Sequence, residues 1–144
     1  MKDYYGPSAW TYDGNGNVLS MTDPDNNKTT YTYDALNREL TETNQSNYTQ
    51  SYGYDAAGNL MTSIDRDGRK TMYGYDALNR RTTEKWISSS NTTLETITTT
   101  YDADGRVLTS GDGNSASVYT YDNDGNMISE TTSQPGVSNV TVTN

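Results

Sequence analysis

Apolar and polar positions alternate along most of the chain, around six tyrosine–aspartate pairs. With the tyrosine of each pair as position zero, an aromatic residue stands two positions earlier in five of the six copies, so both rings share one strand face. Position seven is apolar in five copies, and position eight is serine or threonine in all six. This alternation predicts strands with one half-buried face. The pairs are Tyr12-Asp13, Tyr33-Asp34, Tyr54-Asp55, Tyr75-Asp76, Tyr101-Asp102 and Tyr121-Asp122.

A tight turn is predicted directly after each tyrosine. Position four is glycine or asparagine in every copy, and these residues enter the left-handed backbone region at little cost. The aspartate carboxylate at position one can accept hydrogen bonds from backbone N–H groups of the turn. Together they predict a type I turn that is closed by a left-handed residue. The position-four residues are Gly16, Asn37, Gly58, Asn79, Gly105 and Gly125.

A second turn separates each returning strand from the next repeat. The six second turns contain turn-forming residues but share little else, so exposed loop tips that vary in length and type are expected. The tyrosine–aspartate pairs are 21 residues apart three times, then 26 and 20. A long second turn in the fourth copy is expected to account for the 26-residue spacing. The second turns lie at residues 23–27, 44–47, 65–68, 88–91, 111–114 and 133–136.

The repeats predict an all-β fold. Tandem hairpins of about 21 residues are expected to form a continuous, curved or spiralling antiparallel sheet, since one hairpin alone is marginally stable. No stretch shows a sustained helical period. The expected organisation is an N-terminal cap or partial strand at 1–9, six repeats at 10–132, and a C-terminal turn and partial repeat strand at 133–144. Within the last segment, residues 137–143 are expected to form a new strand.

Composition narrows the classes of function. Only 31% of the 144 residues are hydrophobic, but 13 are tyrosine, which suits a thin sheet with an aromatic face. The net charge of −9 disfavours binding to nucleic acids. The chain has no cysteine, so disulfides and thiolate metal sites are excluded, and it has no apolar run long enough to insert into a membrane.

The repeated motif resembles the YD repeat, also called the RHS repeat. It is clearest at residues 52–60, Tyr-Gly-Tyr-Asp-Ala-Ala-Gly-Asn-Leu, and the resemblance covers about residues 10–132. It implies a spiralling β-sheet, which in bacterial RHS proteins and insecticidal toxin complexes forms a hollow shell around a toxic cargo. In teneurins it implies an extracellular barrel. The family's autoproteolytic segment is not carried over, because Asp23-Pro24 lies in a loop without the surroundings of that segment.

No catalytic, cofactor-binding or metal-binding residue is assigned, and the chain is not expected to be an enzyme. Without histidine or cysteine, the common triads and zinc sites are excluded. The acidic pairs at 102/104 and 122/124 could act as acid and base, but turn residues are the favoured interpretation. The Asp-x-Asp-Gly runs at 65–68, 102–105 and 122–125 resemble the opening of a calcium loop. Their glycine comes too early, so structural calcium is the weaker alternative.

Three further features have two interpretations each. Position five is asparagine or arginine, which either pairs with aspartate, within a repeat or across to its neighbour, or is a solvated polar group. The recurring tyrosines form either a packing face or a platform for sugars. Sequons for N-glycosylation either carry glycans on exposed loops or occur by chance in a chain rich in Asn, Ser and Thr. They begin at Asn27, Asn44, Asn47, Asn91 and Asn139.

These observations predict a non-catalytic structural protein at the cell surface or outside the cell. The leading hypothesis is a subunit that assembles with itself, head to tail through edge strands, into a surface fibre or scaffold. One alternative is a fragment of an RHS-type shell that encapsulates a toxin. The other is a carbohydrate-binding or adhesion module, with glycans as partners.

Overall fold

The computed structural model describes residues 9–143, which form β-strands joined by turns. It divides into two compact units, Met1–Lys70 and Thr71–Asn144. Within each unit, the hydrogen-bonded order of the strands is the order of the chain. The strands are β1 (Ala9–Tyr12), β2 (Val18–Thr22), β3 (Lys28–Tyr33), β4 (Glu39–Thr43), β5 (Thr49–Tyr54), β6 (Leu60–Ile64), β7 (Lys70–Tyr75), β8 (Arg81–Ile87), β9 (Thr93–Tyr101), β10 (Val107–Gly111), β11 (Ala116–Tyr121), β12 (Met127–Gln134) and β13 (Val137–Thr143).

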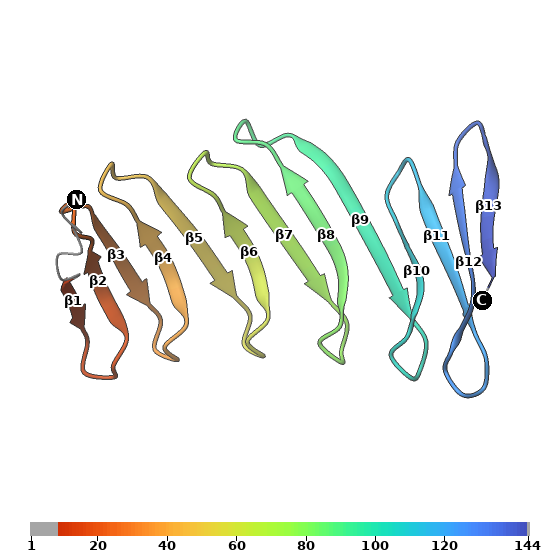
Figure 1. The fold of residues 1–144 in the computed structure, drawn as a ribbon, viewed down its shortest axis with the longest axis horizontal. Coiled ribbons are helices and arrows are strands. Elements are labelled where there is room, and N and C mark those ends of the chain that lie inside the picture. The colour runs from red at the N-terminus through yellow and green to blue at the C-terminus, as the bar shows by residue number, and fades with distance from the viewer. Residues whose placement is uncertain (1–8, 144) are drawn as a thin grey trace, which may run out of the picture. The chain divides into compact units, whose positions relative to one another are not determined.

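Each unit is a series of antiparallel hairpins (Figure 1). In the first unit β1 to β6 pair with their neighbours in turn. In the second unit the same holds from β8 to β13. The predicted all-β fold of tandem antiparallel hairpins is therefore confirmed, and the strand expected at 137–143 is β13. The predicted cap at 1–9 lies, apart from Ala9, outside the described residues, and the domain boundaries and curvature stay predictions.

The two faces of the sheet differ in chemistry. Directly opposite residues share a face, so Tyr31 and Glu42 lie on one side of the β3–β4 pair. The next pair, Thr32 and Thr41, lies on the other side with its hydroxyl oxygens 2.6 Å apart. We call these sides the tyrosine face and the hydroxyl face. Other hydroxyl-face pairs join Thr11 to Ser20, Thr43 to Thr49, Thr100 to Thr109, and Thr120 to Ser129.

The sheet encloses few side chains. Among residues 9–143 only Ile87 and Ser20 are buried, because the strands of each unit lie side by side and leave both faces accessible. The exposed position-seven side chains still lose more than half of their accessible surface to neighbours, with 37% exposure at Met61 and 44% at Ile128. Stability therefore comes from contacts between adjacent hairpins and from the turns.

Four of the second turns have the same geometry as the turns after tyrosine. In the first of these, Asp23 N donates to Asn27 O at 3.1 Å and Asn26 N donates to Asp23 O at 3.0 Å. Asn26 has a φ of 65°, and its counterparts are also left-handed. The expectation that second turns vary in length and type is wrong for this group. The counterparts of Asn26 are Asn47, Gly68 and Asn91.

The 26-residue spacing also has a different cause from the one expected. The turn after β8 is as short as its counterparts, with Ser88 N donating to Thr92 O at 2.8 Å. The added residues extend the strands instead, because β8 has 7 residues and β9 has 9, against 5 in β6 and 6 in β7. A register shift between Trp86 and Ile87 accommodates the unequal lengths as a bulge.

The last two second turns differ from the other four. Between β10 and β11 the turn is contracted, with Asp112 N donating to Ser115 O at 2.8 Å. A Cβ added to Gly111 would lie 2.3 Å from Ser115 O, so only glycine fits there. Between β12 and β13, Pro135 and Gly136 fill a two-residue turn, and Gly136 has a φ of 77°. Proline followed by a left-handed glycine is typical of a type II turn.

Candidate functional site: the motif-turn ladder

We define the motif turns as the six turns that run from the aspartate of each tyrosine–aspartate pair to position five. In the first turn, Asp13 N donates to Asn17 O at 2.9 Å, and Gly16 N donates to Asp13 O at 3.2 Å. The other five turns repeat both bonds. Position four has a positive φ in every copy, from 60° at Asn79 to 95° at Gly58, as predicted. The turn chemistry expected from Asp, Gly and Asn is thus confirmed.

Each motif aspartate organises its own turn. Asp13 Oδ1 accepts from the backbone N–H groups of Asn15 at 2.9 Å and Asn17 at 2.8 Å. Its Oδ2 accepts from the Asn17 side-chain amide at 2.8 Å. Where position five is arginine the guanidinium takes the same place, since Arg38 Nε donates to Asp34 Oδ2 at 2.6 Å. Position five therefore pairs with aspartate within the repeat, which was one of the two interpretations.

These hydrogen bonds stabilise the ionised aspartates. The Asn17 side-chain amide, together with backbone N–H groups, lowers the pKa of Asp13 below its usual value. In the second turn the backbone N–H of Arg38 contributes most to lowering the pKa of Asp34, and the guanidinium adds to it. The pKa values of the other four motif aspartates, Asp55, Asp76, Asp102 and Asp122, are also lowered. Hydrogen bonds to the charged form outweigh the desolvation that opposes them.

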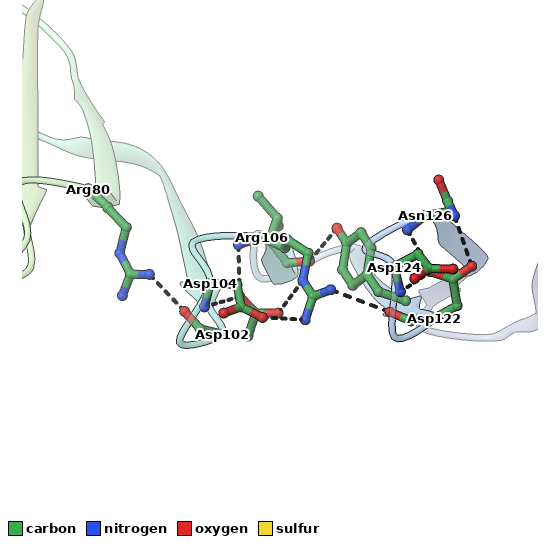
Figure 2. Close-up of polar contacts among 9 residues, drawn as sticks. Arg80, Asp102, Asp104, Arg106, Asp122, Asp124 and Asn126 are labelled. Atoms are coloured by element: carbon green, nitrogen blue, oxygen red, sulfur yellow. Dashed lines mark hydrogen bonds and ion pairs between the residues drawn. The ribbon is translucent and has the colours of Figure 1, made fainter.

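Arginine at position five also reaches the next repeat. Arg80 Nη1 donates to the backbone oxygen of Asp102 at 2.8 Å, and Arg106 Nη1 lies 3.5 Å from the backbone oxygen of Asp122 (Figure 2). The Arg80 guanidinium also stacks over the ring of Tyr101, at 4.7 Å from the centroid. Such cation–π contacts add to the attraction between repeats. Arg38 makes the equivalent contacts with Asp55 and Tyr54.

The motif tyrosines make a contact in the opposite direction. The Tyr121 hydroxyl donates to Val107 O of the preceding repeat at 2.8 Å. Tyr33 and Tyr101 donate in the same way to Val18 O at 2.9 Å and Arg81 O at 2.7 Å. A junction therefore has arginine reaching forward from one repeat and tyrosine reaching back from the next.

The first junction uses asparagine in place of arginine. Asn37, at position four of the second repeat, accepts at Oδ1 from the side-chain amides of Asn17 at 2.8 Å and Asn15 at 3.0 Å. A contact of position five with the neighbouring repeat was one of the expectations, but its partners were not predicted: the side chain of position four here, and a backbone oxygen where position five is arginine. The available signal was the restriction of position five to Asn and Arg, two residues with side-chain N–H donors.

The structure also places the acidic-pair and sequon residues that were singled out from the sequence. Asp104 lies in a motif turn, where its Oδ2 is 3.0 Å from Arg106 Nη2 and its N–H donates to Asp102. Asn27 and Asn44 are engaged in their own turns, whereas Asn47, Asn91 and Asn139 are exposed. Glycosylation of these asparagines stays a prediction, and so does the weak possibility of calcium. Residues 9–143 contain no cluster of three potential metal ligands from His, Cys, Asp and Glu, and no helix suited to crossing a bilayer.

Family models match two stretches of the chain. The model described as RHS Repeat matches residues 12–50, 38–70 and 54–85, which together span slightly more than half of the 144 residues. The chain belongs to the RHS repeat family. A second model, described as Teneurin YD-shell, matches residues 74–141. Comparison with curated proteins finds no match.

Solved structures show the same fold in much longer chains. The crystal structure of TcdB2-TccC3-Cdc42 matches 94% of this chain at 18% identity, with a TM-score of 0.64. The Tc holotoxin pore of Photorhabdus luminescens matches the same share at 18% identity, with a TM-score of 0.63. This chain covers only 10% of the matched chain in the first structure and 9% of the matched chain in the second. At this identity the likeness concerns the fold alone.

Proposed function

We propose that this chain is a wall segment of a YD-repeat shell, with a structural and non-catalytic role. The observation that carries the proposal is the two-way junction between successive repeats. Arg106 reaches forward to the Asp122 turn, and Tyr121 reaches back to Val107. Contacts of this kind suit a wall that grows by adding hairpins, because each added hairpin is held to its neighbour in both directions.

The comparisons support a shell over a fibre. RHS Repeat and Teneurin YD-shell models together cover the stretch from residue 12 to residue 141, and the matched structures include chains of toxin complexes. A secreted or extracellular location fits the same relatives. A self-assembling surface fibre, the leading hypothesis from the sequence, has no comparable support. A sugar platform is less favoured, since the rings of Tyr54, Tyr101 and Tyr121 are each stacked against a guanidinium.

Electron microscopy of the purified chain at high concentration tests this proposal. A variant that lacks residues 137–144, and hence β13, is the matched sample. A wall segment gives monodisperse particles from both proteins. Filaments from the intact chain alone would overturn the proposal in favour of the fibre.

A second measurement addresses the shell itself. The coding sequence around this segment is expected to continue the tyrosine–aspartate repeats, and particles of the encoded protein are expected to be hollow. Solid or extended particles would contradict the shell. A glycan array tests the remaining alternative, a carbohydrate-binding module. A wall segment should bind no sugar in preference to the others, so selective binding of one sugar would favour the module.

A further inference from the structure

Positions five and four of adjacent repeats are matched across every junction inside the two units. Position five of one repeat lies near position four of the next at the Asn17–Asn37 and Arg106–Gly125 junctions. In the sequence only two combinations of these positions occur. Asparagine at position five is followed by asparagine at position four, and arginine is followed by glycine. The pairs are Asn17 with Asn37, Arg38 with Gly58, Arg80 with Gly105, and Arg106 with Gly125. In the sequence, Asn59 and Asn79 obey the same rule.

The asparagine pair has a direct explanation. With a φ of 61°, Asn37 directs its side chain to the preceding repeat, where Oδ1 lies 2.8 Å from Asn17 Nδ2 and 3.0 Å from Asn15 Nδ2. Glycine at this place would leave both amides without that acceptor. The side chain of asparagine at position five is shorter than that of arginine and does not reach the backbone of the next turn. A contact between the repeats therefore requires an acceptor side chain at position four of that turn.

Space explains the arginine–glycine pair directly at one junction. A Cβ added to Gly125 would lie 3.5 Å from Arg106 Nη1, whereas nothing lies within 4 Å of a Cβ added to Gly58 or Gly105. The remaining atoms of an asparagine, directed as in Asn37, would enter the volume of the guanidinium. That guanidinium lies 5.0 Å from the ring centroid of Tyr121 and 3.5 Å from the backbone oxygen of Asp122. An asparagine here would displace it from both.

We propose that these two positions form a pairing code that selects which YD repeat can dock beside another. Asparagine selects a repeat with asparagine at position four, and arginine selects one with glycine. The code does not depend on the wall proposal, because it concerns how any two such repeats fit together.

The code specifies a partner for the last repeat of this chain. Asn126 is at position five there; its amide donates to Asp122 Oδ2 at 3.0 Å and its side chain is exposed. β13 pairs with the outer edge of β12 and so takes the place of the first strand of the next repeat. A YD hairpin built on β13 is therefore expected to carry asparagine at position four of its motif turn.

A double-mutant cycle at the Arg106–Gly125 junction tests the code. Arg106→Asn and Gly125→Asn each create a mismatch, and the double variant restores the asparagine pair. We expect each single change to lower the melting temperature by about 2–4 °C, and the double variant to return to within about 1 °C of the unaltered chain. Additive losses in the double variant would overturn the code.

A matched control exists in the same chain. Arg69 and Gly68 repeat the local chemistry, with Arg69 Nε 2.6 Å from Asp65 Oδ2 and Nη2 3.0 Å from Asp67 Oδ2. The corresponding contacts of Arg106 with Asp102 and Asp104 have the same lengths. Arg106→Asn combined with Gly68→Asn should be additive, since Gly68 lies in a second turn and not across a motif-turn junction from Arg106. Equal coupling in this control would show that the effect does not depend on the junction, which also overturns the code.

Discussion

The hydroxyl of Tyr121 offers a direct test of how the repeats are held together. Tyr121→Phe removes the 2.8 Å hydrogen bond to Val107 O but keeps the aromatic ring beneath the Arg106 guanidinium. A neutral hydrogen bond contributes about 0.5–1.5 kcal/mol net. Because the side chain is only half-buried, water can reach the vacated carbonyl, and the lower part of that range applies, about 0.5–1 kcal/mol. For a chain of this length the melting temperature should fall by about 2–3 °C.

Tyr119→Phe is the matched control. Tyr119 lies on the same strand, β11, and on the same face as Tyr121, two residues earlier. Within residues 9–143 no hydrogen bond of its hydroxyl is found, so its removal should leave the free energy of unfolding unchanged. Urea denaturation followed by circular dichroism measures both variants against the parent. Equal midpoints for the two variants would refute the role assigned to the Tyr121 hydroxyl.

Three other perturbations test the turns. Acidification should destabilise the chain, because the pKa values of Asp13 and Asp122 are lowered by the side-chain amides at position five. A lowered folded pKa means that the stabilisation is present above the unfolded value of about 3.9 and is lost as the pH falls through the folded value. Gly16→Ala should cost about 1–2 kcal/mol, since φ is 90° there, whereas Gly14→Ala should cost little. Gly111→Ala should cost about 1–3 kcal/mol through its clash with the neighbouring strand.

Each of these has a clear contrary result. Thermal melts that stay level between pH 7 and about pH 2 would contradict the aspartate prediction. Equal unfolding midpoints for the two alanine variants of the first motif turn would show that backbone conformation is not what selects glycine at position four. A tolerated alanine at Gly111 would mean that the β10–β11 turn relaxes freely, and hydrogen exchange of β11 would then be faster than in the parent.

The local part of the fold was predictable because turn chemistry is local. Glycine or asparagine three residues after aspartate is sufficient to predict a left-handed residue, and both Gly16 and Asn37 have positive φ. The same rule, applied with serine or asparagine as the first residue, would have found the matching geometry at Asn47 and Asn91. Turns were predicted at both places, but their shared geometry was not, because the second turns have no tyrosine–aspartate pair that marks their first position.

The longer strands were less accessible from the sequence. Five added residues could extend a loop or the two strands that flank it, and the apolar pattern is equally compatible with both. The decision depends on cross-strand pairing, where Glu84 faces Ile97 and Trp86 faces Glu95. These pairs lie 13 and 9 residues apart in the chain, beyond the reach of a turn rule.

The hairpin, its motif turn and the two faces of the sheet each depend on residues a few positions apart, so they could be predicted from the sequence. The way in which one repeat meets the next is visible only in the folded structure. Whether Arg106 ends in solvent or beneath the Asp122 turn depends on the distance between neighbouring hairpins, which backbone hydrogen bonding between strands sets. The same spacing brings the Tyr121 hydroxyl to a backbone oxygen 14 residues earlier in the chain. A repeat therefore encodes its own shape, while its contacts are encoded jointly with its neighbour.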